Sequence, residues 1–192
     1  MTEKRMRTTA TDFTTRDDDG KLSIEGYFAV YDSIYQIAPN MTESIAQGAF
    51  DNTISDDIRC LINHDTTLVL GRTKAGTLQL RTDNRGLWGH VDINPNDVDA
   101  MNLYNRVQRG DVDQCSFGFD IIDEETEFRD DGAVHWTIKE VKLYEVSPCT
   151  FPAYEETNIA ARTKERAELI KRKNDAWRDK ITKKLKGEDE NA

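Results

Sequence analysis

Three polar side chains stand out because together they could carry out nucleophilic attack on a carbonyl group: His64, Ser116 and Glu145. A serine hydroxyl is a poor nucleophile unless an adjacent base, usually a histidine, removes its proton. A buried carboxylate in turn needs a partner, and a histidine is one suitable partner. Such chemistry requires that the elements carrying these three residues bring them together.

His64 ends a short apolar run over residues 58–64, and such a run predicts a buried strand. Side chains alternate along a strand, so Ile58, Cys60, Ile62 and His64 should share one face. This pattern places His64 at the rim of the core, where the strand ends. A structural core histidine with one hydrogen bond would show the same pattern.

Ser116 lies in the segment Cys115-Ser-Phe-Gly-Phe119. In a strand, the cysteine and the two phenylalanines occupy one face, and Ser116 and Gly118 occupy the other. A small hydroxyl beside a glycine leaves room for another chain to approach, as a nucleophile requires. The same arrangement could instead serve only to let two elements pack closely.

Glu145 belongs to a predicted strand over residues 134–146. The apolar positions change phase near Glu140, which predicts a β-bulge. Beyond that point Glu145 should share the apolar face with Val141 and Leu143. A carboxylate on that face would need a partner, whereas a surface salt bridge near the strand end is the structural alternative.

The rest of the body predicts short strands joined by turns, together with one long helix over residues 97–109 that ends at Gly110. These elements indicate a β-rich α+β fold of barrel or sandwich type with attached helices. The other predicted elements are strands over 22–31, 78–82, 87–93 and 115–122, helical turns over 43–48 and an acidic loop over 123–131.

The composition suits one domain with an appendage: 192 residues, 37% of them hydrophobic and 32% charged. Residues 160–192 carry 11 Lys/Arg and 7 Asp/Glu, whereas the preceding residues carry 15 and 29. The acidic body argues against direct binding of nucleic acid. No apolar stretch is long enough to cross a membrane, and the N-terminus lacks an apolar signal core. We therefore expect the protein to stay in the cytoplasm where it is made.

The cysteines and histidines argue against two other kinds of site. Cys60, Cys115 and Cys149 are widely spaced without a pattern, which favours three small buried side chains over disulfides. A cysteine protease would need Cys115 or Cys149, but Cys115 should point away from the face of Ser116. The histidines form no HxH or HExxH pattern, so we predict neither a metal site nor a cofactor.

The sequence resembles the prohead maturation proteases of tailed phages, through blocks that follow the family's order over residues 24–157. No single block is decisive, but the ordered set is specific. Cys149 stands where a valine is expected. The blocks are Gly26-Tyr-Phe-Ala-Val-Tyr31, Glu43-Ser-Ile-Ala-Gln-Gly-Ala-Phe50, Leu61-Ile-Asn-His-Asp65, Val69-Leu-Gly-Arg72, Arg109-Gly-Asp111, Ser116-Phe-Gly-Phe119 and Leu143-Tyr-Glu-Val-Ser-Pro-Cys-Thr-Phe-Pro-Ala-Tyr154.

The resemblance implies a herpesvirus-protease-like fold, in which a mainly antiparallel β-barrel is surrounded by helices. It implies a serine endopeptidase with Ser116 as the nucleophile and His64 as the base. Glu145 is the expected third member of the triad, with Glu140 as the second choice. Asp65 is less suited because adjacent strand residues point to opposite faces.

The resemblance also implies where the enzyme works and on what. We expect it inside the assembling prohead in the host cytoplasm, with the major capsid protein, the scaffold and the protease itself as substrates. Related folds often pair through helices, so a homo-oligomer is also considered. Backbone amides near Ser116 or in residues 69–72, with Arg72 acting through a water, are the candidate oxyanion donors. A non-enzymatic capsid or scaffold component is the alternative function.

Residues 160–192 predict a charged helical tail that follows a protease domain over residues 1–159. The apolar residues of the tail fall near heptad spacing, which is typical of helix–helix association. We expect the tail to recruit the protease to the scaffold or to be removed by self-cleavage, although a solvated helix would look similar. The stripe consists of Ala167, Ile170, Trp177, Ile181 and Leu185, with Asn174 in one slot.

Overall fold

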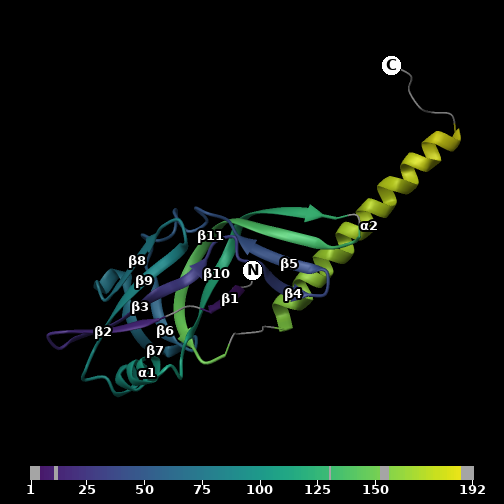
Figure 1. The fold of residues 1–192 in the computed structure, drawn as a ribbon. Helices are drawn as coiled ribbons and strands as arrows, with labels where there is room; N and C mark the ends of the chain where they lie inside the picture. Colours follow the sequence, from purple (N-terminus) through teal and green to yellow (C-terminus); the bar gives the residue numbers. More distant parts are fainter. Residues whose placement is uncertain (1–4, 11–12, 130, 152–155, 187–192) are drawn as a thin grey trace.

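The computed structural model describes residues 5–10, 13–129, 131–151 and 156–186. It is β-rich, with two sheets, two α-helices and one 3-10 turn (Figure 1). One sheet contains β1 (Arg5–Ala10), β4 (Tyr35–Ala38), β5 (Met41–Ile45), β6 (Arg59–Ile62), β7 (Asp65–Arg72), β10 (Gln114–Phe128) and β11 (Val134–Cys149). The other contains β2 (Thr14–Asp18), β3 (Lys21–Val30), β8 (Leu78–Thr82) and β9 (Gly86–Ile93), and the helices are η1 (Thr73–Ala75), α1 (Val98–Arg109) and α2 (Glu156–Lys186).

The seven-stranded sheet is mixed, and β11 is its centre. The strand order is β1-β10-β11-β5-β4, and β6 pairs with both β11 and β7. β11 runs antiparallel to β10 but parallel to β5 and to β6. The four-stranded sheet, in the order β2-β3-β9-β8, is antiparallel throughout. β11 therefore has neighbours from distant parts of the sequence.

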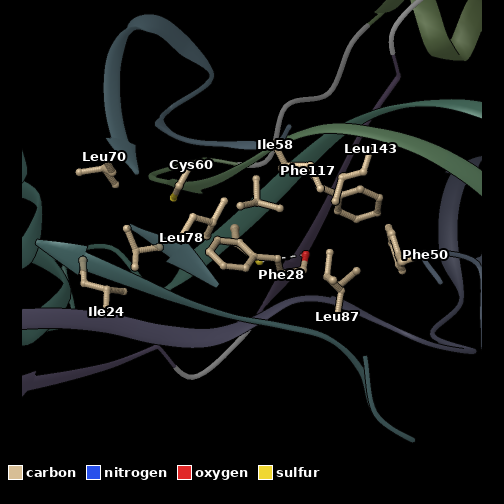
Figure 2. Packing of buried hydrophobic residues seen from close by; sticks show 14 of the residues in the cluster. Ile24, Phe28, Phe50, Ile58, Cys60, Leu70, Leu78, Leu87, Phe117 and Leu143 are labelled. Atoms are coloured by element: carbon tan, nitrogen blue, oxygen red, sulfur yellow. Dashed lines mark hydrogen bonds between the residues drawn. The ribbon is translucent and has the colours of Figure 1, made fainter. Parts of the chain in front are cut away.

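The main core lies between the two sheets. Phe28 and Leu87 from the smaller sheet belong to one apolar cluster with Phe117 and Leu143 from the larger sheet (Figure 2). The ring of Phe117 stacks on that of Phe119 at 5.0 Å between centroids. These contacts place the phenylalanine-bearing face of β10 against the smaller sheet. The opposite face of β10 is therefore available for other side chains.

The fold class and several elements are confirmed. The structure is β-rich α+β, and the strands predicted over residues 78–82 and 87–93 are β8 and β9, which pair as an antiparallel hairpin. The predicted helix is α1, which begins where Asp97 accepts hydrogen bonds from the N–H groups of Asp99 and Ala100 and ends at Gly110. Among the described residues the strands form two open sheets, so the expected closed barrel is not confirmed.

Two local predictions are wrong. The helical turns expected over residues 43–48 are instead β5 and the turn that follows, because residues 41–45 pair in parallel with β11. The acidic loop expected over residues 123–131 is mostly strand, since β10 continues to Phe128 and pairs with β11 as far as Val134. Partner strands supply the hydrogen bonds here, and the acidic side chains lie mainly on exposed positions.

The tail is helical, as predicted, and its first turns pack on the larger sheet. The Arg162 side chain is fully buried, and Leu169 packs against the small apolar cluster of Met41, Val134 and Trp136. Farther along, Trp177 and Ile181 are exposed, and α2 extends beyond the sheets (Figure 1). The Leu185 side chain and residues 187–192 lie outside the described part, as do residues 152–154 of the last family block.

The boundary between a domain over residues 1–159 and a tail over 160–192 stays a prediction. Within the described part of the chain, neither helix is long and apolar enough to cross a membrane.

Candidate active site

His64 lies in the two-residue turn that joins β6 to β7. Ile62 pairs with Asp65, and both Asn63 and His64 have left-handed backbones, with φ of +50° and +62°. This is the dihedral pattern that tight hairpin turns require. The prediction that the strand continues through His64 is therefore wrong, because the chain reverses after Ile62. The alternation before the turn is confirmed, since Ile58, Cys60 and Ile62 are all buried in the core.

The turn is attached to the end of β11 by three hydrogen bonds. The N–H of Asn63 donates to the carbonyl of Pro148 at 3.1 Å, and the side-chain carbonyl of Asn63 accepts from the N–H of Thr150 at 3.0 Å. The N–H of His64 donates to the Oγ of Ser147 at 3.3 Å. These bonds hold two non-glycine residues in a backbone conformation that they adopt only rarely.

Glu145 is the partner of the His64 imidazole. Its Oε1 lies 2.8 Å from Nδ1 of His64, and its Oε2 accepts a hydrogen bond of 2.7 Å from the Ser147 hydroxyl. The Glu145 side chain is 3% exposed and that of His64 is 13% exposed. Both carboxylate oxygens are therefore bonded in a nearly dry environment, where such bonds are strong.

A second bulge in β11 explains why Glu145 reaches this face of the sheet. Leu143 pairs with Phe119, but Glu145 pairs with Gly118, so Tyr144 is an extra residue on β11. The prediction that Glu145 shares a face with Leu143 is therefore wrong. The insertion moves Glu145 to the face opposite Leu143, whereas the bulge predicted near Glu140 is confirmed by register shifts on either side of its partner Asp123.

Ser116 lies on the same face as this histidine–carboxylate pair. Ser116 pairs with Ser147 across the two strands, and Gly118 pairs with Glu145, so these four residues share one face of the sheet. Ser116 is fully buried. Within the described part of the chain, neither its Oγ nor Nε2 of His64 has a hydrogen-bond partner. Such buried polar atoms in a folded protein call for an explanation.

The other candidate residues lie outside this cluster. Glu140 accepts a hydrogen bond from Asn52 at 3.0 Å and has no described contact with His64. The Asp65 carboxylate accepts bonds from the backbone and hydroxyl of Thr67, which lowers its pKa. Arg72, in β7 and not in a loop, is bound through its guanidinium to Asp57.

The cysteines have the environment of core residues. All three are buried thiols outside any disulfide, and the Cys115 thiol donates to backbone carbonyls on the Phe117 side of the sheet. Burial, with a smaller contribution from the charge of Glu145, raises the pKa of Cys149 to about 11. Burial also raises the pKa of Cys60. Among the described residues no group of histidine, cysteine and acidic side chains could hold a metal ion.

Two residues of the cluster, Asn63 and Ser147, were not singled out from the sequence. A usable signal existed for Ser147, because a residue two positions from Glu145 on a strand shares its face. No comparable signal exists for Asn63, whose role depends on the turn and on contacts with β11.

A histidine bonded to a buried carboxylate, on a sheet face that also carries a buried serine, can support nucleophilic attack by the serine. Comparison with known proteins agrees with that class of chemistry. A model of the family described as caudovirus prohead serine protease matches residues 9–172. The prohead protease of Enterobacteria phage HK97 is 31% identical over 147 residues, which cover 74% of this chain and 61% of that relative.

The chain belongs to the caudovirus prohead serine protease family. It spans 61% of the length of the HK97 relative. Among solved structures, the bacteriophage T4 capsid assembly protease gp21 is similar with a TM-score of 0.51 and 11% sequence identity, over 77% of this chain and 97% of that one. At that identity the likeness concerns the fold alone.

Proposed function

We propose that this protein is a serine endopeptidase that cleaves segments of capsid and scaffold proteins, and itself, during prohead maturation. The observation that carries the proposal is the 2.8 Å contact between Nδ1 of His64 and Glu145, on the face that Ser116 shares. Family membership supports the same activity. The herpesvirus-protease likeness of the fold is part of this proposal.

In the proposed mechanism, Nε2 of His64 takes the proton of Ser116 as its Oγ attacks the peptide carbonyl carbon. The C–N bond then breaks, and the imidazolium gives the proton to the leaving amine. Water then attacks the acyl carbon with His64 again as the base, the ester bond to Ser116 Oγ breaks, and the imidazolium returns the proton to the serine oxygen. Glu145 keeps the other imidazole proton on Nδ1 and stabilises the positive charge of the ring. Among the described residues, Nε2 of His64 and Oγ of Ser116 have no hydrogen-bond partner and are not bonded to each other, so they would have to approach for the proton to move between them.

The strand pairing of Ser116 limits where the oxyanion donors can be. Ser116 lies between β1 and β11, so the sheet uses the backbone groups around it. The guanidinium of Arg72 is held by Asp57 and would have to leave that pair to contribute. Of the donors suggested by the sequence, the backbone amides near Ser116 and the Arg72 guanidinium therefore already have other partners.

We further propose that the enzyme acts inside the assembling prohead in the host cytoplasm, and that the exposed part of α2 recruits it to a helical scaffold segment. A chain that ends at Arg172 tests the recruitment, because it keeps Arg162 and Leu169 but lacks the exposed Trp177 and Ile181. We expect normal cleavage of a peptide substrate and reduced copies per prohead. Normal packaging would contradict the recruitment.

Size measurements on the free protein will show whether it forms a homo-oligomer.

The experiment that tests the activity is co-expression with the capsid and scaffold proteins, followed by mass spectrometry of their termini. We expect processing by the unaltered protein and none by Ser116→Ala. Ser23→Ala, a change of another buried serine on β3, is the matched control and should process normally. Unchanged processing by Ser116→Ala would reject the proposal and favour a non-enzymatic capsid or scaffold role.

A further inference from the structure

We propose that Ser147 is a positioning residue of this site, and that its hydroxyl sets both the Glu145 carboxylate and the backbone of His64. The inference rests on the proposed function, and it adds a residue that neither the sequence blocks nor the proposed triad assigns. Ser147 is fully buried, and both of its hydrogen-bond partners belong to the histidine–carboxylate pair.

The two bonds of Ser147 fix the orientation of its hydroxyl. A hydroxyl has one proton to donate and lone pairs to accept. The N–H of His64 can only donate, and an ionised Glu145 carboxylate can only accept. The Ser147 proton must therefore point to Oε2 of Glu145 at 2.7 Å, while its oxygen accepts from His64 N at 3.3 Å. One hydroxyl thus joins the strand, the carboxylate and the turn.

The bond to His64 matters because the backbone of this residue is in the left-handed region, with φ of +62°. A non-glycine residue stays in such a conformation only where its surroundings determine it. Asn63, the preceding residue of the turn, is bonded to β11 through its own N–H. Among the described contacts, the N–H of His64 donates only to the Ser147 hydroxyl. Ser147 therefore fixes the position of the His64 backbone, and with it the base of the imidazole side chain, relative to β11.

The bond to Glu145 holds the carboxylate for the imidazole. With Oε2 occupied by Ser147, Oε1 faces Nδ1 of His64 at 2.8 Å. Partners of this kind fix the tautomer and orientation of a histidine, and their loss at metal-bound histidines costs about 10- to 100-fold in function. We expect a loss of similar size here, because the triad members would remain but their alignment would loosen.

The same geometry separates Ser147 from the proposed nucleophile. Ser147 and Ser116 face each other across β10 and β11, but Ser147 already donates its proton to Glu145. The Ser116 Oγ, by contrast, is a buried hydroxyl without a hydrogen-bond partner among the described residues. Ser147 should therefore affect the rate without being required for the chemistry.

The test compares Ser147→Ala and Ser147→Thr in the full chain, with kcat and KM measured on a peptide that spans a mapped cleavage site. We expect Ser147→Ala to lower kcat about 10- to 100-fold with little change in KM, and Ser147→Thr, which keeps the hydroxyl, to recover most of the rate. Ser44→Ala is the matched control, because Ser44 is a buried serine whose hydroxyl bonds His135 at 3.0 Å outside this site. It should leave kcat unchanged.

A spectroscopic measurement makes the outcome independent of activity. The nitrogen NMR shifts of His64 should show the proton on Nδ1 in the unaltered protein and a mixture of tautomers in Ser147→Ala. An unchanged tautomer together with an unchanged kcat would overturn the positioning role. A loss as complete as that of Ser116→Ala would also overturn it, and would make Ser147 a candidate nucleophile.

Two further comparisons distinguish a failure of the positioning role from misfolding of the variant and from a failure of the proposed function. Should Ser147→Ala fail to fold, Ser147→Cys makes the same comparison with a weaker donor of similar size. If instead Ser116→Ala remains active, the proposed function fails, and the NMR result still decides whether Ser147 positions His64.

Discussion

Two glutamates are buried in the larger sheet, and their partners differ. Glu145 on β11 faces the imidazole of His64 at 2.8 Å, whereas Glu43 on β5 faces the guanidinium of Arg162 from α2 at 2.8 Å. Both side chains are almost completely buried, with exposures of 3% and 1%. Each is bonded to a group that belongs to a different element, so each joins two parts of the fold.

The partner decides what each buried carboxylate can do. A guanidinium stays protonated and only donates, so the pair of Glu43 and Arg162 can hold α2 on the sheet but cannot move a proton. An imidazole can accept and release a proton near neutral pH, so the pair of Glu145 and His64 can take part in chemistry. Burial of an acid is therefore not itself a sign of a catalytic site.

Arg162 has several partners besides Glu43, although its Nε has none among the described residues. It also bonds Glu124 and Glu165 and lies over the ring of Trp136, at 4.6 Å from the centroid. Burial lowers the pKa of Arg162, but the hydrogen bond to Glu124 and the charge of Glu43 outweigh burial and raise the pKa overall. The Arg162 guanidinium therefore keeps its charge at neutral pH.

The largest expected effect is on the serine that shares the face of Glu145. Ser116→Ala should lower kcat on a peptide substrate about 10⁶-fold, because the loss of a nucleophile removes the contribution of the whole triad. The free energy of unfolding should change little, since the hydroxyl has no described partner. Single-turnover kinetics and urea unfolding measure the two quantities. A loss of activity that only follows unfolding would contradict the role.

Arg162→Met should have the opposite effects. It leaves Glu43 buried without its main partner, which should destabilise the protein by about 3–5 kcal/mol. Substitution of both Arg162→Met and Glu43→Gln should restore part of that stability, because no buried charge is left. Urea unfolding measures the free energies, and peptide cleavage at low temperature should show a near-normal kcat. A large loss of kcat in a folded Arg162→Met protein would remove the distinction between the two pairs.

The sequence predicted more of the core than of the site. Alternation identified the buried faces at Ile58, Cys60 and Ile62 and on β10, because period-2 patterning is a local property. The choice of His64, Ser116 and Glu145 depended on the family blocks, since local chemistry also allowed structural roles for each. The turn at His64 was missed because Asn63-His64 contains no glycine to indicate it.

The second bulge was missed for a different reason. Val146 is apolar but out of phase with Leu143, and this weak local signal is the only one that the bulge leaves in the strand pattern. The parallel pairing of β11 with β5 and β6 has no local signal at all, because it joins segments far apart in the chain. Both features were needed to place Glu145 beside His64.

The smallest expected effect concerns the thiols. Burial raises the pKa of Cys149 to about 11, so at neutral pH the thiol is almost entirely protonated, and the reactive thiolate accumulates only as the pH approaches that value. Iodoacetamide at pH 7.5 should therefore leave peptide cleavage unchanged, as measured by initial rates. Rapid inactivation of the folded protein at that pH would point to a cysteine in the chemistry.

The central claim is that Glu145 serves chemistry and Glu43 serves stability, and the most direct measurement compares Glu145→Gln with Glu43→Gln in one set of assays. We predict that Glu145→Gln lowers kcat about 10⁴-fold, as loss of the acid does in comparable triads, and shifts unfolding by no more than about 1 kcal/mol. Glu43→Gln should keep kcat and lose about 1–3 kcal/mol of stability. Glu140→Gln is the control and should change neither. Near-normal turnover by Glu145→Gln, with a loss in Glu140→Gln, would contradict the account and move the acid to Glu140.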